Sequence, residues 1–317
     1  MIRRDNWWRR RCLTGLALFS FSILNGQAEE KNYVARMQEL GLDRLKGSIP
    51  AYYSVGHQQH AEKLQAAIAD MNVFFRDRLG VQAEVTLALL NSKDWKSVTG
   101  EDYGIPQVEG NPPVIFMPAT PDNPVFGLMN ARKEAIPSEQ LQAFLKDNHT
   151  TFEAVAAQFV DLIGFHELGH ALTNNLGIDP QDSWLSEFLA NYWSYAYIAE
   201  RQPEWKRVFA LLGRPSKIRP KNTTLEDFEL LYSDVDDYGW YQGMFESRIR
   251  EIYPLRGLQF LRDLKREFPR TAGRSSRESG ATIPPAQVLE RLEKIAPGFQ
   301  KWATEFNSSA AATSPRH

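Results

Sequence analysis

The residues of this chain best suited to chemistry are the two histidines of the run His166-Glu167-Leu168-Gly169-His170. Histidines four residues apart lie on one face of a helix, at a separation that suits a single metal ion. Two neutral imidazoles at this spacing favour zinc. Glu167 lies beside them and could take a proton from water that the metal activates. The pattern therefore predicts a catalytic metal site held by His166 and His170.

A catalytic zinc site of this kind needs a third protein ligand and leaves one position open. Glu187 is the candidate, because it follows His170 after sixteen intervening residues and lies on the next apolar helix. A carboxylate on a buried helix needs a partner. The alternative role for Glu187 is a salt bridge or an interaction with the helix dipole. Leu176 and Thr173 exclude the subclass in which a third histidine lies six residues after the second.

These motifs resemble those of the gluzincin metallopeptidases, the group that contains thermolysin and the zinc aminopeptidases. The resemblance covers roughly residues 149–268, and it includes the Trp-x-x-Glu pattern at residues 184–187. It implies that His166, His170 and Glu187 bind Zn²⁺ and that Glu167 is the general base. It also implies a peptide or protein substrate, whose peptide bond is hydrolysed by water activated by the zinc.

The resemblance also suggests supporting residues. Asn191 lies four residues after Glu187, on the same helix face, where gluzincins often place a polar residue that holds a ligand histidine. The oxyanion that forms during peptide hydrolysis needs a hydrogen-bond donor, which gluzincins commonly supply from a tyrosine or histidine after the zinc-binding Glu. The candidates are Tyr238 and Tyr241, because the terminal His317 is the only histidine after Glu187. We prefer Tyr238, because it lies where the tyrosine-bearing helix of the aminopeptidase-like enzymes would begin. Aromatic core packing is the alternative role for both tyrosines.

Three other polar residues and one glycine have less specific interpretations. His57 and His60 form an i, i+3 pair near a predicted helix start without a carboxylate that would complete a metal site, and we expect them to be solvated. Asp161 is likewise expected to be a solvated or cap-related carboxylate. Gly169 indicates either the close crossing of another element or room for a substrate backbone.

Residues 1–28 have the pattern of a signal peptide. Residues 1–11 contain five arginines and one aspartate, residues 12–24 are almost wholly apolar, and small residues precede Glu29. The apolar run is too short to cross a bilayer comfortably. We therefore predict cleavage after Ala28, a secreted or periplasmic protein, and no stable membrane span after cleavage. The alternative is an uncleaved N-terminal anchor.

Cys12, the single cysteine, lies in this segment, so the mature chain has no thiolate ligand and no disulfide.

Composition limits the class of protein. The chain has 317 residues, of which 43% are hydrophobic and 24% charged, values typical of a globular protein. Its formal charge is −2, and removal of residues 1–28 with their five arginines and one aspartate takes it to −6. This balance argues against a nucleic-acid partner. The oligomeric state is not indicated.

Apolar periodicity and turn residues predict the elements. A capping-box pattern at residues 150–153 begins the strongest helix, which continues to about residue 174. Strands are expected at residues 85–90 and 113–117, and a loop-rich connection at 118–147. The other helices are expected at residues 33–45, 60–79, 182–200, 203–212, 225–231, 238–252, 257–268 and 285–295.

The predicted fold class is α+β, with a small mixed N-terminal sheet that borders a mostly helical, zincin-like catalytic half. Residues 113–117 are expected to form the edge strand along the substrate cleft. The predicted segments are a signal peptide (1–28), an N-terminal α/β lobe (29–146), a helical catalytic lobe (147–270), a linker with a C-terminal helix (271–306) and a disordered tail (307–317).

Two alternative functions remain open at this stage. One is hydrolysis of a substrate other than a peptide. The chain could also be a non-catalytic zinc-binding module of the cell envelope that keeps a zincin-like fold. Glu167 favours an enzyme, because a structural zinc has no use for a carboxylate that does not bind it.

Overall fold

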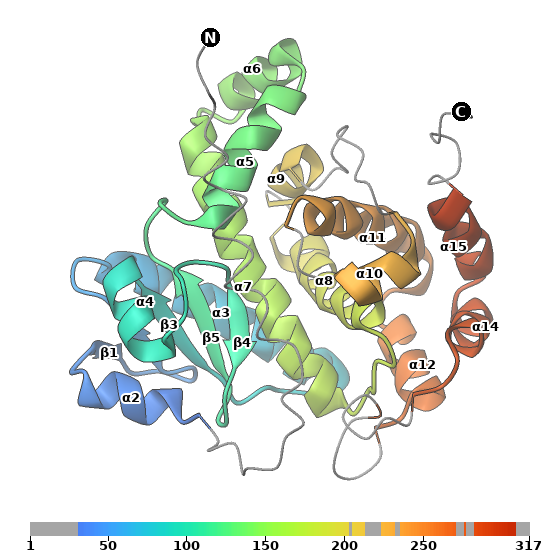
Figure 1. The fold of residues 1–317 in the computed structure, drawn as a ribbon, viewed down its shortest axis with the longest axis horizontal. Coiled ribbons are helices and arrows are strands. Elements are labelled where there is room, and N and C mark those ends of the chain that lie inside the picture. The colour runs from blue at the N-terminus through green and yellow to red at the C-terminus, as the bar shows by residue number, and fades with distance from the viewer. Residues whose placement is uncertain are drawn as a thin grey trace.

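The structure is a computed structural model that describes residues 31–202, 205–212, 223–231, 235–270, 276 and 282–308. The predicted signal peptide lies outside the described residues, and so do most of the predicted linker and residues 309–317 of the predicted tail. The described part is an α+β protein, in which a five-stranded sheet lies beside a larger group of helices (Figure 1).

The sheet contains five short strands. They are β1 (Asp43–Leu45), β2 (Ala51–Tyr53), β3 (Thr86–Leu90), β4 (Gln107–Glu109) and β5 (Val114–Pro118). Their order across the sheet is β1-β2-β3-β5-β4, and the β2-β3 and β3-β5 pairs are parallel while the two outer pairs are antiparallel. This confirms a small mixed sheet. The prediction that residues 113–117 form an edge strand is wrong, because β5 pairs on both sides and β4 is the edge.

The two faces of the sheet pack against different helices. Leu87, Leu89, Ile115 and Met117 belong to the main core, which also contains residues of α3 (Gln58–Leu79) and α7 (Phe152–Leu176). The alternate residues of the same strands, such as Phe116, pack in a smaller core against α2 (Tyr33–Glu39) and α4 (Ser92–Thr99). Because β3 and β5 are buried on both faces, both are continuous apolar runs in the sequence.

The site depends on α7, α8 (Ser183–Arg201) and α11 (Val235–Arg256), which pack side by side (Figure 1). Helix α7 begins after Thr151, whose hydroxyl accepts a hydrogen bond from the backbone N–H of Ala154 at 3.2 Å. The cap is therefore Thr151, one residue later than the capping-box pattern implied. Gly177 ends the helix in the left-handed conformation, with φ of 80°.

The remaining helices complete the described part of the chain. They are α5 (Pro124–Ala135), α6 (Ser138–Asp147), α9 (Trp205–Leu212), α10 (Leu225–Leu231), α12 (Gln259–Glu267), α14 (Pro285–Ile295) and α15 (Phe299–Ser308). Most of the predicted helices are confirmed to within a few residues. Among the described residues, no helix has the length and apolar character needed to cross a membrane.

Several local predictions are wrong. The predicted loop at residues 118–147 contains the helices α5 and α6, which Asn123 and Pro137 precede. Proline at the first positions of a helix starts it rather than breaking it, because the missing N–H has no helical partner there. The predicted helix at 33–45 ends at Glu39, and its last three residues form β1. Helix α15 was not predicted, and it extends to Ser308, two residues into the predicted tail.

Candidate metal centre

Two neighbouring helices carry the three predicted ligands. His166 and His170 lie one turn apart on α7, and Glu187 lies in the second turn of α8. The side chain of Glu187 is only 6% exposed, so its carboxylate needs partners inside the protein. The structure brings the three side chains together, and among the described residues they form a group that could hold a metal ion.

The three side chains point at one another through the atoms that bind metals. The Nε2 atoms of His166 and His170 are 3.2 Å apart. Oε2 of Glu187 is 2.9 Å from Nε2 of His166, and its Oε1 is 3.5 Å from Nε2 of His170. Two zinc–nitrogen bonds at a tetrahedral angle place their nitrogens about 3.3 Å apart. The donor set and its spacing therefore fit zinc.

The electrostatics of the cluster differ between the two histidines. Burial acts to lower the pKa of His166, but the adjacent Glu187 carboxylate outweighs it and raises the pKa to about 9. Burial lowers the pKa of His170 to about 4, against a smaller opposing effect of Glu187. In the metal-free protein at neutral pH, His166 is therefore protonated and paired with Glu187, whereas His170 is neutral and can offer a lone pair.

Glu167 lies beside the cluster without belonging to the donor group. It is buried, and burial raises the pKa of its carboxyl to about 8, with a further contribution from the negative charge of Glu187. The backbone N–H of Val108, in the edge strand β4, donates a hydrogen bond to it. A carboxyl group with a pKa near neutrality, next to a metal site, can accept and return a proton.

A chain of side-chain amides supports the ligands from behind. Nδ1 of His166 is 2.9 Å from Oδ1 of Asn191, the contact that the sequence suggested for Asn191. Nδ2 of Asn191 donates to Oε1 of Gln242, and Nε2 of Gln242 donates to Oε2 of Glu187 at 2.9 Å. Gln242 was not predicted as a site residue. Its position four residues after Tyr238, on the same helix face, was the available signal.

Ser186 is a second residue that sequence reasoning missed. Its hydroxyl is 3.3 Å from Nδ1 of His170. Ligand histidines commonly use their second nitrogen in this way, which orients the ring. Its place immediately before Glu187 was not informative by itself, because neighbouring residues of a helix point in different directions.

The two candidate tyrosines lie in different surroundings. The hydroxyl of Tyr238 donates to Oε2 of Glu187 at 2.6 Å, so it lies at the cluster. The hydroxyl of Tyr241 donates to the backbone carbonyl of Thr224 at 2.8 Å, and its ring packs against Phe228 in the core. The structure therefore brings Tyr238 to the candidate site, and it places Tyr241 in core packing, the alternative role.

His60 and Asp161 interact outside the cluster. Nε2 of His60, in α3, is 2.8 Å from Oδ1 of Asp161, in α7. The hydrogen bond with Asp161 raises the pKa of His60, against the opposing effect of burial. The expectation that both residues are simply solvated is wrong. They lie 101 positions apart in the chain, so only the packing of α3 on α7 could reveal the pair.

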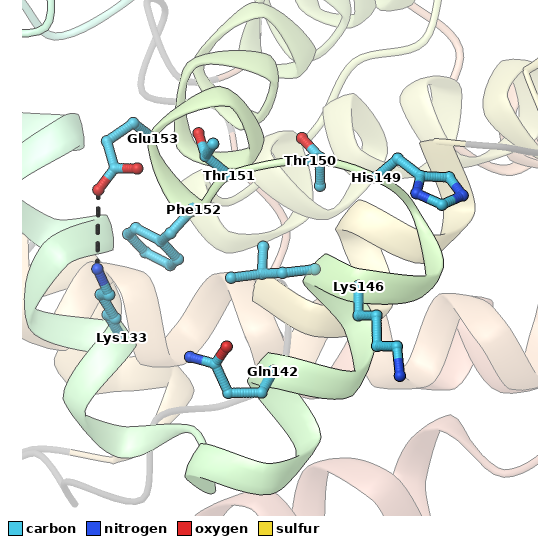
Figure 2. A pocket seen from close by; sticks show the side chains of 9 residues that line it. Lys133, Gln142, Lys146, His149, Thr150, Thr151, Phe152 and Glu153 are labelled. Atoms are coloured by element: carbon cyan, nitrogen blue, oxygen red, sulfur yellow. Dashed lines mark ion pairs between the residues drawn. The ribbon is translucent and has the colours of Figure 1, made fainter.

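A separate hollow lies at the other end of α7. It has a volume of about 520 Å³, and Figure 2 shows Lys133 and Glu153 facing each other at its side, 3.7 Å apart. Phe152, in its lining, precedes His166 by fourteen residues, which corresponds to about 21 Å along a helix. The hollow is therefore not part of the candidate metal site.

The fold and the site together define an α+β protein with a His-His-Glu group suited to a metal ion. Comparisons with known proteins add nothing to this description. Neither the protein-family models, nor curated protein sequences, nor solved structures gave a match to this chain.

Proposed function

We propose that this protein is an exported zinc metallopeptidase of the gluzincin type. One observation carries the proposal. His166 and His170 of α7 and Glu187 of α8 direct metal-binding atoms to one point, while Glu167 lies beside them outside the donor group. A structural zinc site would use four protein ligands and would need no adjacent carboxylate.

The proposed reaction is hydrolysis of a peptide bond. When bound, a zinc ion supplies Lewis acidity, which lowers the pKa of water and polarises a carbonyl oxygen. Glu167, which lies beside the donor group without belonging to it, takes the proton from the attacking water and delivers it to the leaving amine. The Tyr238 hydroxyl donates a hydrogen bond to the developing oxyanion, for which it leaves Glu187.

Glu167→Gln tests catalysis separately from metal binding. The amide keeps the shape of the side chain but removes its basicity, so zinc content and folding should persist. Peptide cleavage should fall about a hundred- to ten-thousand-fold. We would compare wild type and variant, recovered from the secreted or periplasmic fraction with an N-terminus near Glu29, by metal analysis and a broad peptide-cleavage profile.

The competing function is a non-catalytic zinc-binding module. Zinc-loaded wild type that cleaves no peptide would favour that module. Cleavage by Glu167→Gln at the wild-type rate would place the activity in another site or in a contaminant.

A further inference from the structure

We infer that Gln242 is a positioning residue, whose side-chain amide aligns Glu187 and His166 for the metal ion by linking Glu187 to Asn191. This inference rests on the proposed zinc site. It concerns a residue of α11, a helix that contributes no metal ligand among the described residues.

Gln242 contacts one ligand directly and a second through Asn191. Its Nε2 donates to Oε2 of Glu187 at 2.9 Å, and its Oε1 accepts a hydrogen bond from Nδ2 of Asn191. Oδ1 of Asn191 in turn lies 2.9 Å from Nδ1 of His166. The link therefore runs from a ligand carboxylate, through two amides, to a ligand imidazole.

The chemistry of these groups gives the link one direction. The ionised Glu187 carboxylate can only accept hydrogen bonds, so the NH₂ group of Gln242 must point towards it. The side-chain oxygen of Gln242 then points towards Asn191. The NH₂ group of Asn191 then donates a hydrogen bond to Gln242, and the side-chain oxygen of Asn191 faces His166. An oxygen at that place requires a proton on Nδ1 of His166. The lone pair of the neutral ring is thereby placed on Nε2, the atom that faces His170 and Glu187.

A metal site gains from this arrangement because two ligands are oriented before the metal arrives. Without the amide of residue 242, Asn191 could turn its NH₂ group towards Nδ1 of His166. That orientation would favour a proton on Nε2, the nitrogen whose lone pair the metal needs. Glu187 would also lose one of its donors. Loss of such outer partners typically weakens metal affinity about ten- to a hundredfold.

The test is zinc affinity, measured by competition with a chelator and without any substrate. Gln242→Met has a similar length and no polar atoms, and we expect its zinc Kd to rise about ten- to a hundredfold. Gln140→Met makes the same change at an exposed position of α6, and its Kd should equal that of wild type. A Gln242→Met Kd within twofold of wild type would overturn the inference.

A double-mutant cycle with Asn191→Ala distinguishes a link from two separate contacts. If both residues act through one link, the double variant should bind zinc about as weakly as the weaker single variant. Losses that multiply would show independent contacts and would overturn the link.

The Tm of each metal-free variant separates positioning from general stability. Gln242→Asn is the second variant, because its amide is one methylene too short to reach both partners, and we expect it also to lose affinity. Metal-free unfolding of both Gln242 variants would show a structural role and overturn the inference. Wild type that binds zinc but cleaves nothing would end the peptidase proposal alone, and wild type that binds no zinc would end both.

Discussion

At the scale of single residues, the hydroxyl of Tyr238 has two possible partners. In the metal-free protein it donates to Glu187 at 2.6 Å, and in the proposed reaction it donates to the oxyanion. A donor that serves the oxyanion stabilises the transition state more than the bound substrate. Loss of the hydroxyl should therefore lower kcat if it serves the oxyanion, and should weaken zinc binding if it serves to hold Glu187.

We expect Tyr238→Phe, fully loaded with zinc, to lose about a hundred- to a thousandfold in kcat, with KM little changed. Tyr241→Phe is the matched control. Its hydroxyl binds the Thr224 carbonyl, so it should keep kcat and lose only about 1 kcal/mol of stability. Steady-state kinetics at saturating zinc measure both variants. If Tyr238→Phe kept its kcat but bound zinc more weakly, the hydroxyl would serve to hold Glu187.

The protonation of His166 predicts how zinc affinity depends on pH. Glu187 raises the pKa of His166 to about 9, so at neutral pH zinc must displace a proton from this ring. Affinity should therefore rise about tenfold for each pH unit between pH 7 and pH 9 and level off above it. Isothermal titration at several pH values, in buffers of different ionisation enthalpy, would count the protons released. Affinity that is flat from pH 7 to 9 would contradict a protonated His166.

The raised pKa of His166 also makes the stability of the metal-free protein depend on pH, in the opposite direction to zinc affinity. A histidine whose pKa is higher in the folded than in the unfolded state stabilises the fold at low pH. The contribution of the His166–Glu187 pair is complete below about pH 6.5 and is lost as the pH rises through about 9. The stabilisation that zinc adds should consequently be larger at pH 8.5 than at pH 6.5.

At the scale of elements, the site depends on the close crossing of α7 and α8 at Gly169. A Cβ atom at Gly169 would lie 2.8 Å from the carbonyl oxygen of Ala190 and 3.2 Å from Cβ of Trp193. The crossing helix, one of the two expected explanations, therefore accounts for this glycine. Because His170 follows Gly169 and Glu187 precedes Ala190 by three residues, this contact sets the distance between the ligands.

Gly169→Ala should destabilise the protein and weaken zinc binding. Overpacking costs about 1–3 kcal/mol and outweighs the gain of about 1 kcal/mol in helix propensity, because the atoms in the way are backbone atoms. Gly164→Ala, on the same helix, is the control. Its Cβ would meet flexible ends of Ile68 and Met117 at 3.4 Å or more, so it should be neutral or slightly stabilising. Chemical denaturation and chelator competition measure both effects, and equal behaviour of the two variants would refute the argument.

At the scale of the whole molecule, the described core is large and apolar. One continuous apolar cluster joins the sheet, α3, α7, α8 and α11, and it includes large buried side chains such as Phe165, Phe188 and Trp193. Zinc should therefore stabilise a protein that already folds, unlike the small domains whose folding requires a metal.

Removal of zinc should lower the Tm without loss of secondary structure. Free zinc at about a thousand times its Kd adds about 4 kcal/mol, which for a chain of this size corresponds to roughly 6–7 °C. Calorimetry with and without a chelator measures the shift, and far-ultraviolet circular dichroism follows the helices. Unfolding on chelation would indicate a structural metal. No shift in Tm would mean that the protein does not bind zinc.

The sequence alone determined the features that depend on local spacing. Apolar periodicity and caps predicted α7, α8, α10 and α14, because burial of one helix face imposes a period that can be read directly. The i, i+4 histidines and the i, i+4 relation of Glu187 to Asn191 follow from the same helix geometry. These relations stay within one helix, so no knowledge of packing was needed to propose them.

Only the tertiary structure decided which groups from different elements meet. The register of α11 against α8 brings Tyr238 and Gln242 to Glu187, and it sends Tyr241 into the core. The pairing of β4 outside β5 decided which strand is the edge. Such contacts depend on distances between segments far apart in the chain, where a shift of one residue along α11 turns a different side chain towards the site, and local patterns carry no information about that register.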